Sequence, residues 1–531
     1  MACAASAQQR IVIVGGGTAG WLTANHLARA LADKYADSVA KPYTITLIES
    51  ANIPTVGVGE GTVPSIRNSL HYFGISESEL IKRCSATFKQ SIDFIGWQPR
   101  GNDGSLHRYQ HIFDYPQIGS KDALYDWIKD GYKTANFADT FSVQSHLVQA
   151  GLAPKKFVQA EFEGVCNYAY HFDAAKFSEL LAENATQKLG VEYLQLEIAK
   201  GVKDSNGGIG YLLTESGQRL EAELFIDCSG GRSLLLGQCL ETEFVSKANE
   251  IFTDTAIATQ VAHPTSEQPI ACATLATAHR AGWIWDIGLV ERRGVGIVYS
   301  SQYMTESEAR QTLAEYLGPD GQENLLTEPR KIPMRSGHYA QFWRRNCVAI
   351  GMSQGFVEPL EATGLLMFDK SAQLLAQMLS DVGPASFKST LESGILQGQF
   401  NQQLRTVWEG VFDFIKLHYC LSKRDDSEFW RAHRDTNTWS AQLSAMLTNW
   451  QMQLPTQNDL RPGVFNLANH LYVLLGMDVR PELDVIHDSS DGDLSGQHRN
   501  TMHAELAHLQ CEILPHRALI EKVRKHGLRR I

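Results

Sequence analysis

The feature that most constrains the fold is a glycine-rich turn near the N-terminus. The apolar run Ile11–Val14 leads directly into G-G-G-T-A-G at residues 15–20, and apolar residues then recur at helical spacing. A second apolar run, Tyr43–Ile48, ends at the acidic residue Glu49. This order of strand, turn, helix, strand and acid predicts a βαβ unit with G-x-G-x-x-G at its first turn.

The residues of this turn have physical roles in dinucleotide binding. Gly15 permits the tight turn, Gly17 lets the backbone approach a pyrophosphate, and Gly20 lets the helix pack on the strand. The helix N-terminus, at Thr18 and Ala19, supplies free N–H groups for the phosphates. The acid that ends the second strand can bind a ribose hydroxyl, although it lies farther along the chain than the usual spacing of about 20 residues. A glycine-rich structural turn is the alternative interpretation.

Two later segments repeat the pattern of a strand followed by small residues. They are Leu224–Ile226, which precedes D-C-S-G-G, and Cys347–Ile350, which ends at Gly351. Such returns favour FAD over NAD(P)H as the bound dinucleotide. The glycines at 207–210 indicate a hairpin turn instead. Because no second G-x-G-x-x-G is present, we expect a separate flavin reductase to supply FADH2, transferred by diffusion.

Composition excludes several classes of protein. The 531 residues are 43% hydrophobic and 20% charged, values that exclude wholesale disorder. The net charge of −11 argues against a general nucleic-acid binder and a polybasic membrane-surface protein. Neither a signal peptide nor an apolar run of about 18 residues is visible. We therefore expect a cytoplasmic protein with no nucleic-acid or membrane partner, and a homodimer is compatible with the sequence.

Potential metal ligands are scattered along the chain. The nine cysteines include no C-x-x-C pair. His498, His503 and His508 are spaced by five residues, which does not bring them to one helical face. We therefore expect neither a disulfide framework nor a metal site.

The chain changes character at about residue 388. Long helical stretches follow, at 388–421, 438–452 and 498–510. The expected fold class is α/β, with an FAD-binding, Rossmann-like domain of the flavoprotein monooxygenase type over residues 1–387. A mainly helical domain over residues 388–531 is expected to complete the substrate site.

Several segments resemble one enzyme family. Gly282–Gly288, G-W-I-W-D-I-G, is similar to the G-W-x-W-x-I-P signature of the flavin-dependent halogenases, the tryptophan halogenase family, with Gly288 in place of the proline. Residues 55–64 resemble the family's flavin-contacting strap, residues 84–89 the segment with its catalytic lysine, and residues 356–365 its halide loop. Residues 424–431 are similar as well, so the resemblance runs from about residue 10 to 480.

The resemblance implies a particular chemistry. Reduced FAD, O2 and a halide ion (chloride or bromide) yield hypohalous acid, which Lys89 holds and aims. Glu361 stabilises the cationic ring intermediate or accepts its proton, and the backbone of Thr363 and Gly364 holds the halide. From the residues alone, Lys89 is a surface lysine at the edge of a predicted helix, Glu361 a solvated loop acid, and Thr363 an N-cap as readily as an anion site.

The family resemblance also assigns the aromatic residues. Trp283 and Trp285 would ordinarily be core aromatics, but it implies that they stand between flavin and substrate. It further implies that the rings of His111 and Phe113 sandwich the substrate and that Val56, Gly57, Val58 and Gly59 contact the flavin. We also expect Phe465 to contact the substrate and Gly351, at the end of its strand, to contact the flavin.

The substrate segment departs from the family pattern. Residues 460–466, L-R-P-G-V-F-N, contain neither the acid nor the paired aromatic residues with which the free-tryptophan enzymes of the family grip the amino acid. Free indole or another electron-rich aromatic is therefore expected at least as strongly as tryptophan. The predicted function is FADH2- and O2-dependent halogenation of an indole-type ring. A flavin-dependent aromatic monooxygenase and a non-catalytic flavin-binding or redox-sensing protein are the alternatives.

Overall fold

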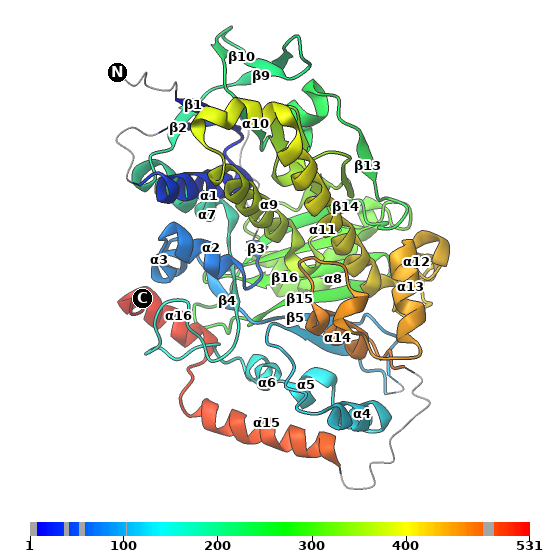
Figure 1. Ribbon diagram of the computed structural model, residues 1–531. Coiled ribbons are helices and arrows are strands. Elements are labelled where there is room, and N and C mark those ends of the chain that lie inside the picture. The colour runs from blue at the N-terminus through cyan, green and yellow to red at the C-terminus, as the bar shows by residue number, and fades with distance from the viewer. Residues whose placement is uncertain (1–7, 37–41, 53–58, 102, 482–492, 531) are drawn as a thin grey trace.

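The structure is a computed structural model that describes residues 8–36, 42–52, 59–101, 103–481 and 493–530 (Figure 1). Within these ranges it contains two large sheets, three smaller three-stranded sheets and a set of long helices. The N-terminal sheet has six strands in the order β20-β21-β12-β1-β2-β8, with β20 (Trp343–Arg344) and β8 (Glu192–Gln195) at its edges. Its parallel core is formed by β21 (Cys347–Ala349), β12 (Leu224–Asp227), β1 (Gln9–Val14) and β2 (Tyr43–Glu49). The four strands predicted from apolar runs are confirmed, and the turns after them meet at the carboxyl edge of this sheet.

The first turn connects β1 to α1 (Thr18–Lys34) as predicted. Gly15 has a φ of +121°, and a Cβ there would collide with the Cys228 carbonyl. A Cβ on Gly20 would collide with the Gly15 carbonyl. Only glycine fits at these two positions. The helix packs against α7 (Ala174–Glu183) and α9 (Thr363–Ser380), which anchors the turn in the core.

A second, seven-stranded sheet lies in the middle of the molecule, with α9 and α11 (Ile395–Cys420) running past it (Figure 1). Its strands, in spatial order, are β18 (Arg330–Pro333), β14 (Thr255–Ala262), β17 (Arg292–Tyr299), β16 (Gly282–Gly288), β15 (Ala273–His279), β5 (Ser91–Ile95) and β6 (Arg108–Ile112). Every residue of β16 is buried. The tryptophan motif is therefore held between two antiparallel neighbours.

The predicted C-terminal helices are present and pack directly on earlier elements. The stretch 388–421 is divided by Gly394, whose φ of +73° separates α10 (Phe387–Ser393) from α11. The other predicted stretches are α13 (Ala441–Trp450) and α15 (Leu494–Gln510). α15 packs against α4 (Lys121–Lys129), α5 (Phe137–Phe141) and α6 (Val143–Gln149). α14 (Leu467–Gly476) packs against β6. The helical region thus closes over the sheet rather than standing apart from it (Figure 1).

Two local predictions have opposite outcomes. The predicted hairpin turn joins β9 (Ile198–Lys203) to β10 (Ile209–Thr214) and is confirmed. The predicted helix around Lys89 is wrong. α3 (Glu77–Arg83) ends early, Ser85 has a φ of +51°, and β4 (Thr87–Lys89) pairs with β7 (Ala169–Asp173). The apolar spacing resembles a helical stripe, but pairing with a strand about 80 residues later decides the conformation.

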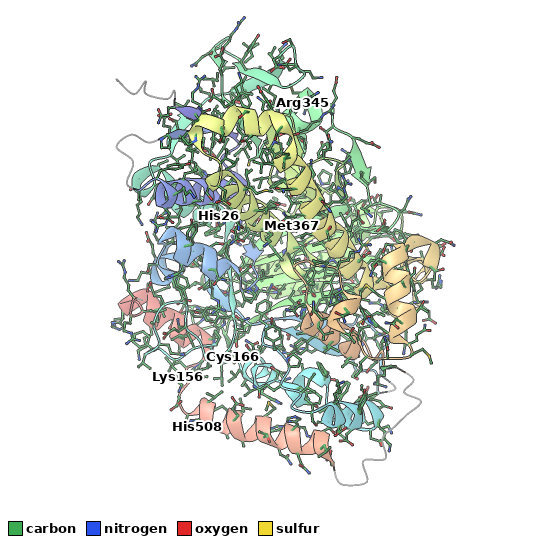
Figure 2. The ribbon with its side chains drawn as sticks, in the orientation of Figure 1. His26, Lys156, Cys166, Arg345, Met367 and His508 are labelled. Carbon is green, nitrogen blue, oxygen red and sulfur yellow. The ribbon has the colours of Figure 1, made fainter. Side chains whose placement is uncertain are left out.

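The three C-terminal histidines, His498, His503 and His508, all lie on α15. Figure 2 places His508 on α15, at the opposite end of the molecule from Arg345. Across the described ranges, no group of three or more histidine, cysteine or acidic side chains is arranged to hold a metal ion. Nor does any helix within those ranges have the length and apolar character needed to cross a membrane.

Candidate functional site

Three neighbouring cavities connect the glycine-rich turn to the helical region. The cofactor cavity, about 270 Å³, is lined by residues 14–19, Glu49 and Cys228. The central cavity, about 260 Å³, is lined by Lys89, both tryptophans of β16 and Glu361. The outer cavity, about 440 Å³, is lined by His111, Phe113 and Phe465. Glu60, Met352 and Phe368 line both the cofactor and central cavities, whereas Glu361 lines both the central and outer ones.

The cofactor cavity fits a dinucleotide. A Cβ on Gly17 would meet nothing within 4 Å, so the backbone there is open to a ligand, and α1 begins without a side-chain cap. Glu49 packs against Gly16 and accepts a hydrogen bond from Tyr193 at 3.0 Å. Gly351 has a φ of +84° and lies against Ala19. Thr18 also lines this cavity.

A buried carboxylate oxygen without a hydrogen-bond partner among the described residues lies where the cofactor and central cavities meet. Oε2 of Glu60 is buried and has no partner among the described residues. Burial, with a smaller contribution from Asp173, raises the pKa of Glu60 to about 7. This atom is therefore available to a group that fills the cavity. Gly59 lines the adjacent central cavity, whereas Val56, Gly57 and Val58 lie outside the described residues.

The paired indoles form one wall of the central cavity. Trp283 and Trp285 lie on the same face of β16, with ring centroids 6.3 Å apart. Gly296 on β17 makes room for them, since a Cβ there would collide with the Trp285 ring. The glycine that replaces the family's proline, Gly288, is still paired with Arg293 and accepts a hydrogen bond from Thr87 at 2.7 Å. The strand is therefore held firmly despite this substitution.

Lys89 is a buried amine without a partner. It is fully buried, and Nζ has no hydrogen-bond acceptor among the described residues. The Nζ atom lies 5.4 Å from the centre of the Phe113 ring, at the boundary with the outer cavity. Desolvation lowers the pKa of Lys89 to about 7, although Glu361 opposes this shift. These observations exclude the alternative of a solvated surface lysine.

Glu361 is a buried, fully oriented carboxylate rather than a solvated loop acid. It is 3% exposed, and His111 Nδ1 lies 2.8 and 2.7 Å from its two oxygens. His418 Nε2 lies 2.9 Å from Oε1. Burial alone would raise the pKa of Glu361, but the two histidines hold it well below the ordinary value. Glu361 and Ala362 both have positive φ, a strained turn that costs of order 1–3 kcal/mol per residue and is typical of functional sites.

The same turn begins α9 and leaves its first amides free of a side-chain cap. The N-cap residue is Ala362, so the interpretation of Thr363 as an N-cap is wrong. The Thr363 hydroxyl instead lies 3.4 Å from the Leu360 carbonyl. A Cβ on Gly364 would meet nothing within 4 Å, and Gly364 lines the central cavity. Unpaired amides at a helix N-terminus are suited to an anion.

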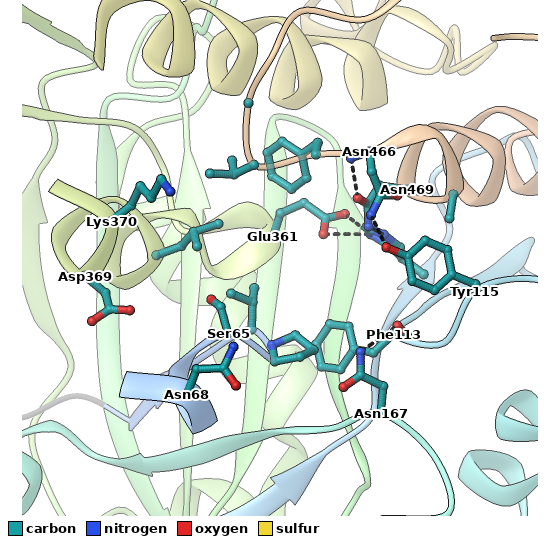
Figure 3. A pocket seen from close by; sticks show the side chains of 18 of the residues that line it. Ser65, Asn68, Phe113, Tyr115, Asn167, Glu361, Asp369, Lys370, Asn466 and Asn469 are labelled. Atoms are coloured by element: carbon teal, nitrogen blue, oxygen red, sulfur yellow. Dashed lines mark hydrogen bonds and ion pairs between the residues drawn. The ribbon is translucent and has the colours of Figure 1, made fainter. Parts of the chain in front are cut away.

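The outer cavity brings together the three rings suggested by the sequence. Figure 3 shows Glu361, Phe113 and Asn469 extending toward it from three segments of the chain. Phe465 stacks on Phe414 with ring centroids 3.9 Å apart. Asn469, on α14, donates to His111 Nε2 at 2.9 Å.

Two residues of this site were missed by sequence reasoning. His418 comes from α11 and Asn469 from α14, and each acts through a contact across more than 50 residues of chain. No local motif marks either of them. Only the hydrogen-bonding demands of a buried carboxylate would have prompted a search for partners.

Comparison with known proteins identifies the family. Residues 10–489 match the family model described as tryptophan halogenase. The chain is 33% identical to the tryptophan 6-halogenase of Streptomyces toxytricini over 492 residues, which cover 88% of this chain and 89% of that protein. It is 32% identical to the tryptophan 7-halogenase of Lentzea aerocolonigenes over 502 residues, covering 89% and 90% of the two chains. The crystal structure of a tryptophan halogenase from Shewanella frigidimarina superposes with a TM-score of 0.90 at 38% identity, covering 99% of each chain. The chain therefore belongs to the tryptophan halogenase family and is a flavin-dependent halogenase.

Proposed function

We propose that this enzyme halogenates an indole-type ring in the outer cavity, using reduced FAD, O2 and a chloride or bromide ion. The observation that supports this most strongly is the Lys89 amine, which has no hydrogen-bond acceptor among the described residues and lies between two cavities, beside the oriented carboxylate of Glu361. A surface lysine or a structural ion pair would not be left in this condition.

The residues divide the work by cavity. Gly15, Gly17, Gly20 and the first amides of α1 would bind the pyrophosphate of FAD, with Glu49 on a ribose. When bound, reduced FAD activates O2 and, with halide, supplies hypohalous acid. The Thr363 and Gly364 amides would hold the halide, and the two tryptophans of β16 would keep the substrate away from the flavin.

Lys89 and Glu361 act on the substrate side of that wall. An amine at the boundary of the central and outer cavities can hydrogen-bond hypohalous acid and direct it at the ring. The Glu361 carboxylate faces the same ring, where it stabilises the positive charge that develops as the halogen adds. The rings of His111, Phe113 and Phe465 would fix the plane of the substrate.

The sequence contains a single dinucleotide-binding motif, so we expect the reduction of FAD by NAD(P)H to take place on another protein. We propose that a separate reductase supplies FADH2 by diffusion and that the enzyme works in the cytoplasm. We also propose a homodimer, and a boundary near residue 387 between the flavin-binding part and the helical part. Size-exclusion chromatography with light scattering measures the oligomeric state.

The test of the proposed function is product identity. The enzyme is supplied with FAD, a flavin reductase, NADH, O2, indole and either bromide or chloride, and the products are identified by mass and NMR. Haloindole is expected. Hydroxyindole alone would support a monooxygenase, and absence of turnover across a panel of aromatics and halides would support a flavin-binding protein.

Tryptophan is expected to be a poorer substrate than indole. The segment 460–466 supplies Phe465 and Asn466 to the outer cavity but no acid for an ammonium group. The measurement is kcat/KM for both substrates under the same conditions. Equal values, or a preference for tryptophan, would show that another part of the cavity grips the amino acid.

A further inference from the structure

His418 is a buried histidine whose two ring nitrogens both face acceptors. It is fully buried on α11. Nδ1 lies 2.8 Å from the Phe414 carbonyl, and Nε2 lies 2.9 Å from Glu361 Oε1. A neutral imidazole has only one N–H, so it can satisfy both contacts only if Glu361 carries the other proton.

The tautomer of the neighbouring histidine, His111, is determined by its own hydrogen bonds. The Asn469 side-chain oxygen accepts from the Asn466 backbone N–H at 2.8 Å, and the Asn466 side-chain oxygen accepts from the Asn469 backbone N–H at 3.2 Å. With its oxygen engaged in this reciprocal cap, Asn469 points its NH2 group at His111. His111 Nε2 is therefore an acceptor, and Nδ1 carries the proton that it donates to Glu361. His111 is a neutral imidazole with a fixed tautomer.

With the protons of His111 assigned, the remaining question is whether the proton between His418 and Glu361 belongs to the imidazole or to the carboxylate. Glu361 already accepts from His111 at both oxygens, an arrangement that favours the carboxylate form. A buried charge needs an opposite charge at hydrogen-bonding distance, and His418 occupies that place. We propose that His418 is an imidazolium that holds Glu361 as a carboxylate, so that His418 is a positioning residue for the halogenation reaction.

The surroundings support a localised ion pair. The titratable groups near it are Lys89, Tyr109, His111 and His470. On its other sides, His418 contacts the rings of Phe94, Trp97 and Phe414. Low polarity around the pair strengthens the attraction between its members.

A functional consequence follows, and it rests on the proposed function. The acceptor nitrogen of His111 is occupied by Asn469, and imidazolium His418 has no lone pair. Neither ring can therefore relay a proton away from Glu361. The carboxylate acts as a fixed negative charge beside the ring, ready before the halogen arrives.

His470 offers a matched control on the same wall. It is 6% exposed and contacts the Phe414 ring, and Nδ1 donates to the Asn466 carbonyl. No carboxylate of the described residues is bonded to its Nε2. Desolvation lowers the pKa of His470 to about 4, so this ring is neutral. The two buried histidines thus differ in the partner of one nitrogen.

The first test compares His418→Gln with His470→Gln in the holoenzyme supplied with reduced FAD, bromide and indole. Glutamine keeps a donor near Glu361 but carries no charge. Without the charge, burial raises the pKa of Glu361 above its ordinary value of about 4.3. The His418→Gln enzyme should therefore lose activity as the pH falls from about 8 to 6, by roughly 10-fold relative to wild type. His470→Gln should keep the wild-type pH profile, and a uniform loss for His418→Gln at every pH would overturn the proposal.

The second test uses the wild-type protein and therefore requires neither enzyme turnover nor a variant that folds. Wild-type protein labelled with ¹⁵N-histidine is examined by long-range ¹H–¹⁵N NMR at pH 7.5, and His418 is assigned through its contacts with the Phe94 and Phe414 rings. Two protonated nitrogens are expected for His418 and one for His111. A bare nitrogen on His418 would overturn the proposal, even if the enzyme halogenates indole. If indole is not halogenated but His418 is doubly protonated, the proposed function fails and the ion pair stands.

Discussion

Two buried clusters of lysine, acid and aromatic side chains differ in whether the lysine has a hydrogen-bond acceptor. In the first, Lys155 and Glu77 are fully buried and 2.7 Å apart, and Lys155 also donates to the Ala160 carbonyl. Tyr168 and Tyr170 donate to the same carboxylate at 2.7 and 2.6 Å. Neither Lys155 nor Glu77 lines any of the three cavities.

The second cluster, around Glu361, is equally buried but incomplete. Its carboxylate is held by two histidines, yet Lys89 has no acceptor among the described residues and lines a cavity. A completed network stabilises the fold, whereas an uncompleted one keeps an amine available for chemistry. The comparison teaches that burial of a lysine does not by itself distinguish structure from function; its partners do.

The largest expected effect concerns the incomplete cluster. Lys89→Met should lower the halogenation rate about 1,000-fold or more, because it removes the group that holds the electrophile. FAD binding, followed by flavin fluorescence, should be unchanged, and the thermal midpoint should not fall, since no hydrogen bond is lost. A variant that still halogenates indole at a rate near that of wild type would remove Lys89 from the mechanism.

The complete cluster should respond in the opposite way. Lys155→Met leaves Glu77 as an uncompensated buried charge and should lower the free energy of unfolding by about 3–5 kcal/mol. Urea unfolding measures the change, and kcat of the folded fraction should stay within about 2-fold of wild type. If Lys155→Met instead lost activity with its stability intact, the assignment of this cluster to structure would be wrong.

A smaller effect appears in the pH dependence of stability. Burial lowers the pKa of Lys89 to about 7 from about 10.4 in the unfolded chain. Between these values the unfolded state holds a proton that the folded state lacks, so raising the pH favours folding. Wild type should gain about 1 kcal/mol per pH unit relative to Lys89→Met between pH 7.5 and 8.5. Parallel pH dependence of the two proteins in urea unfolding would contradict a buried, unpaired Lys89.

Much of the fold is predictable from local sequence because it depends on local rules. The strand before Gly15, the helix after it and the strand that ends at Glu49 follow from apolar periodicity and the needs of a tight turn. The conformation at Lys89 does not, because β4 is set by pairing with β7 far along the chain.

The functional site also combines features that local sequence predicts with features that depend on distant contacts. Thr363 and Gly364 could be assigned to a helix N-terminus from sequence, but the strained turn that makes Ala362 the N-cap could not. The ligands of Glu361 arrive from β6 and α11, so no spacing in the sequence relates them. Contacts between distant elements are therefore what separates the predicted residues from the assembled site.

The pKa of Lys89 is the quantity that tests this account most directly. Protein labelled with ¹³C at lysine Cε is titrated by NMR, and the Lys89 resonance is assigned by its loss in Lys89→Met. A midpoint near pH 7 is predicted, because Nζ is desolvated without a paired acceptor. A midpoint at the ordinary value of about 10.4 would contradict the account, since it would place Lys89 in water or in a complete ion pair.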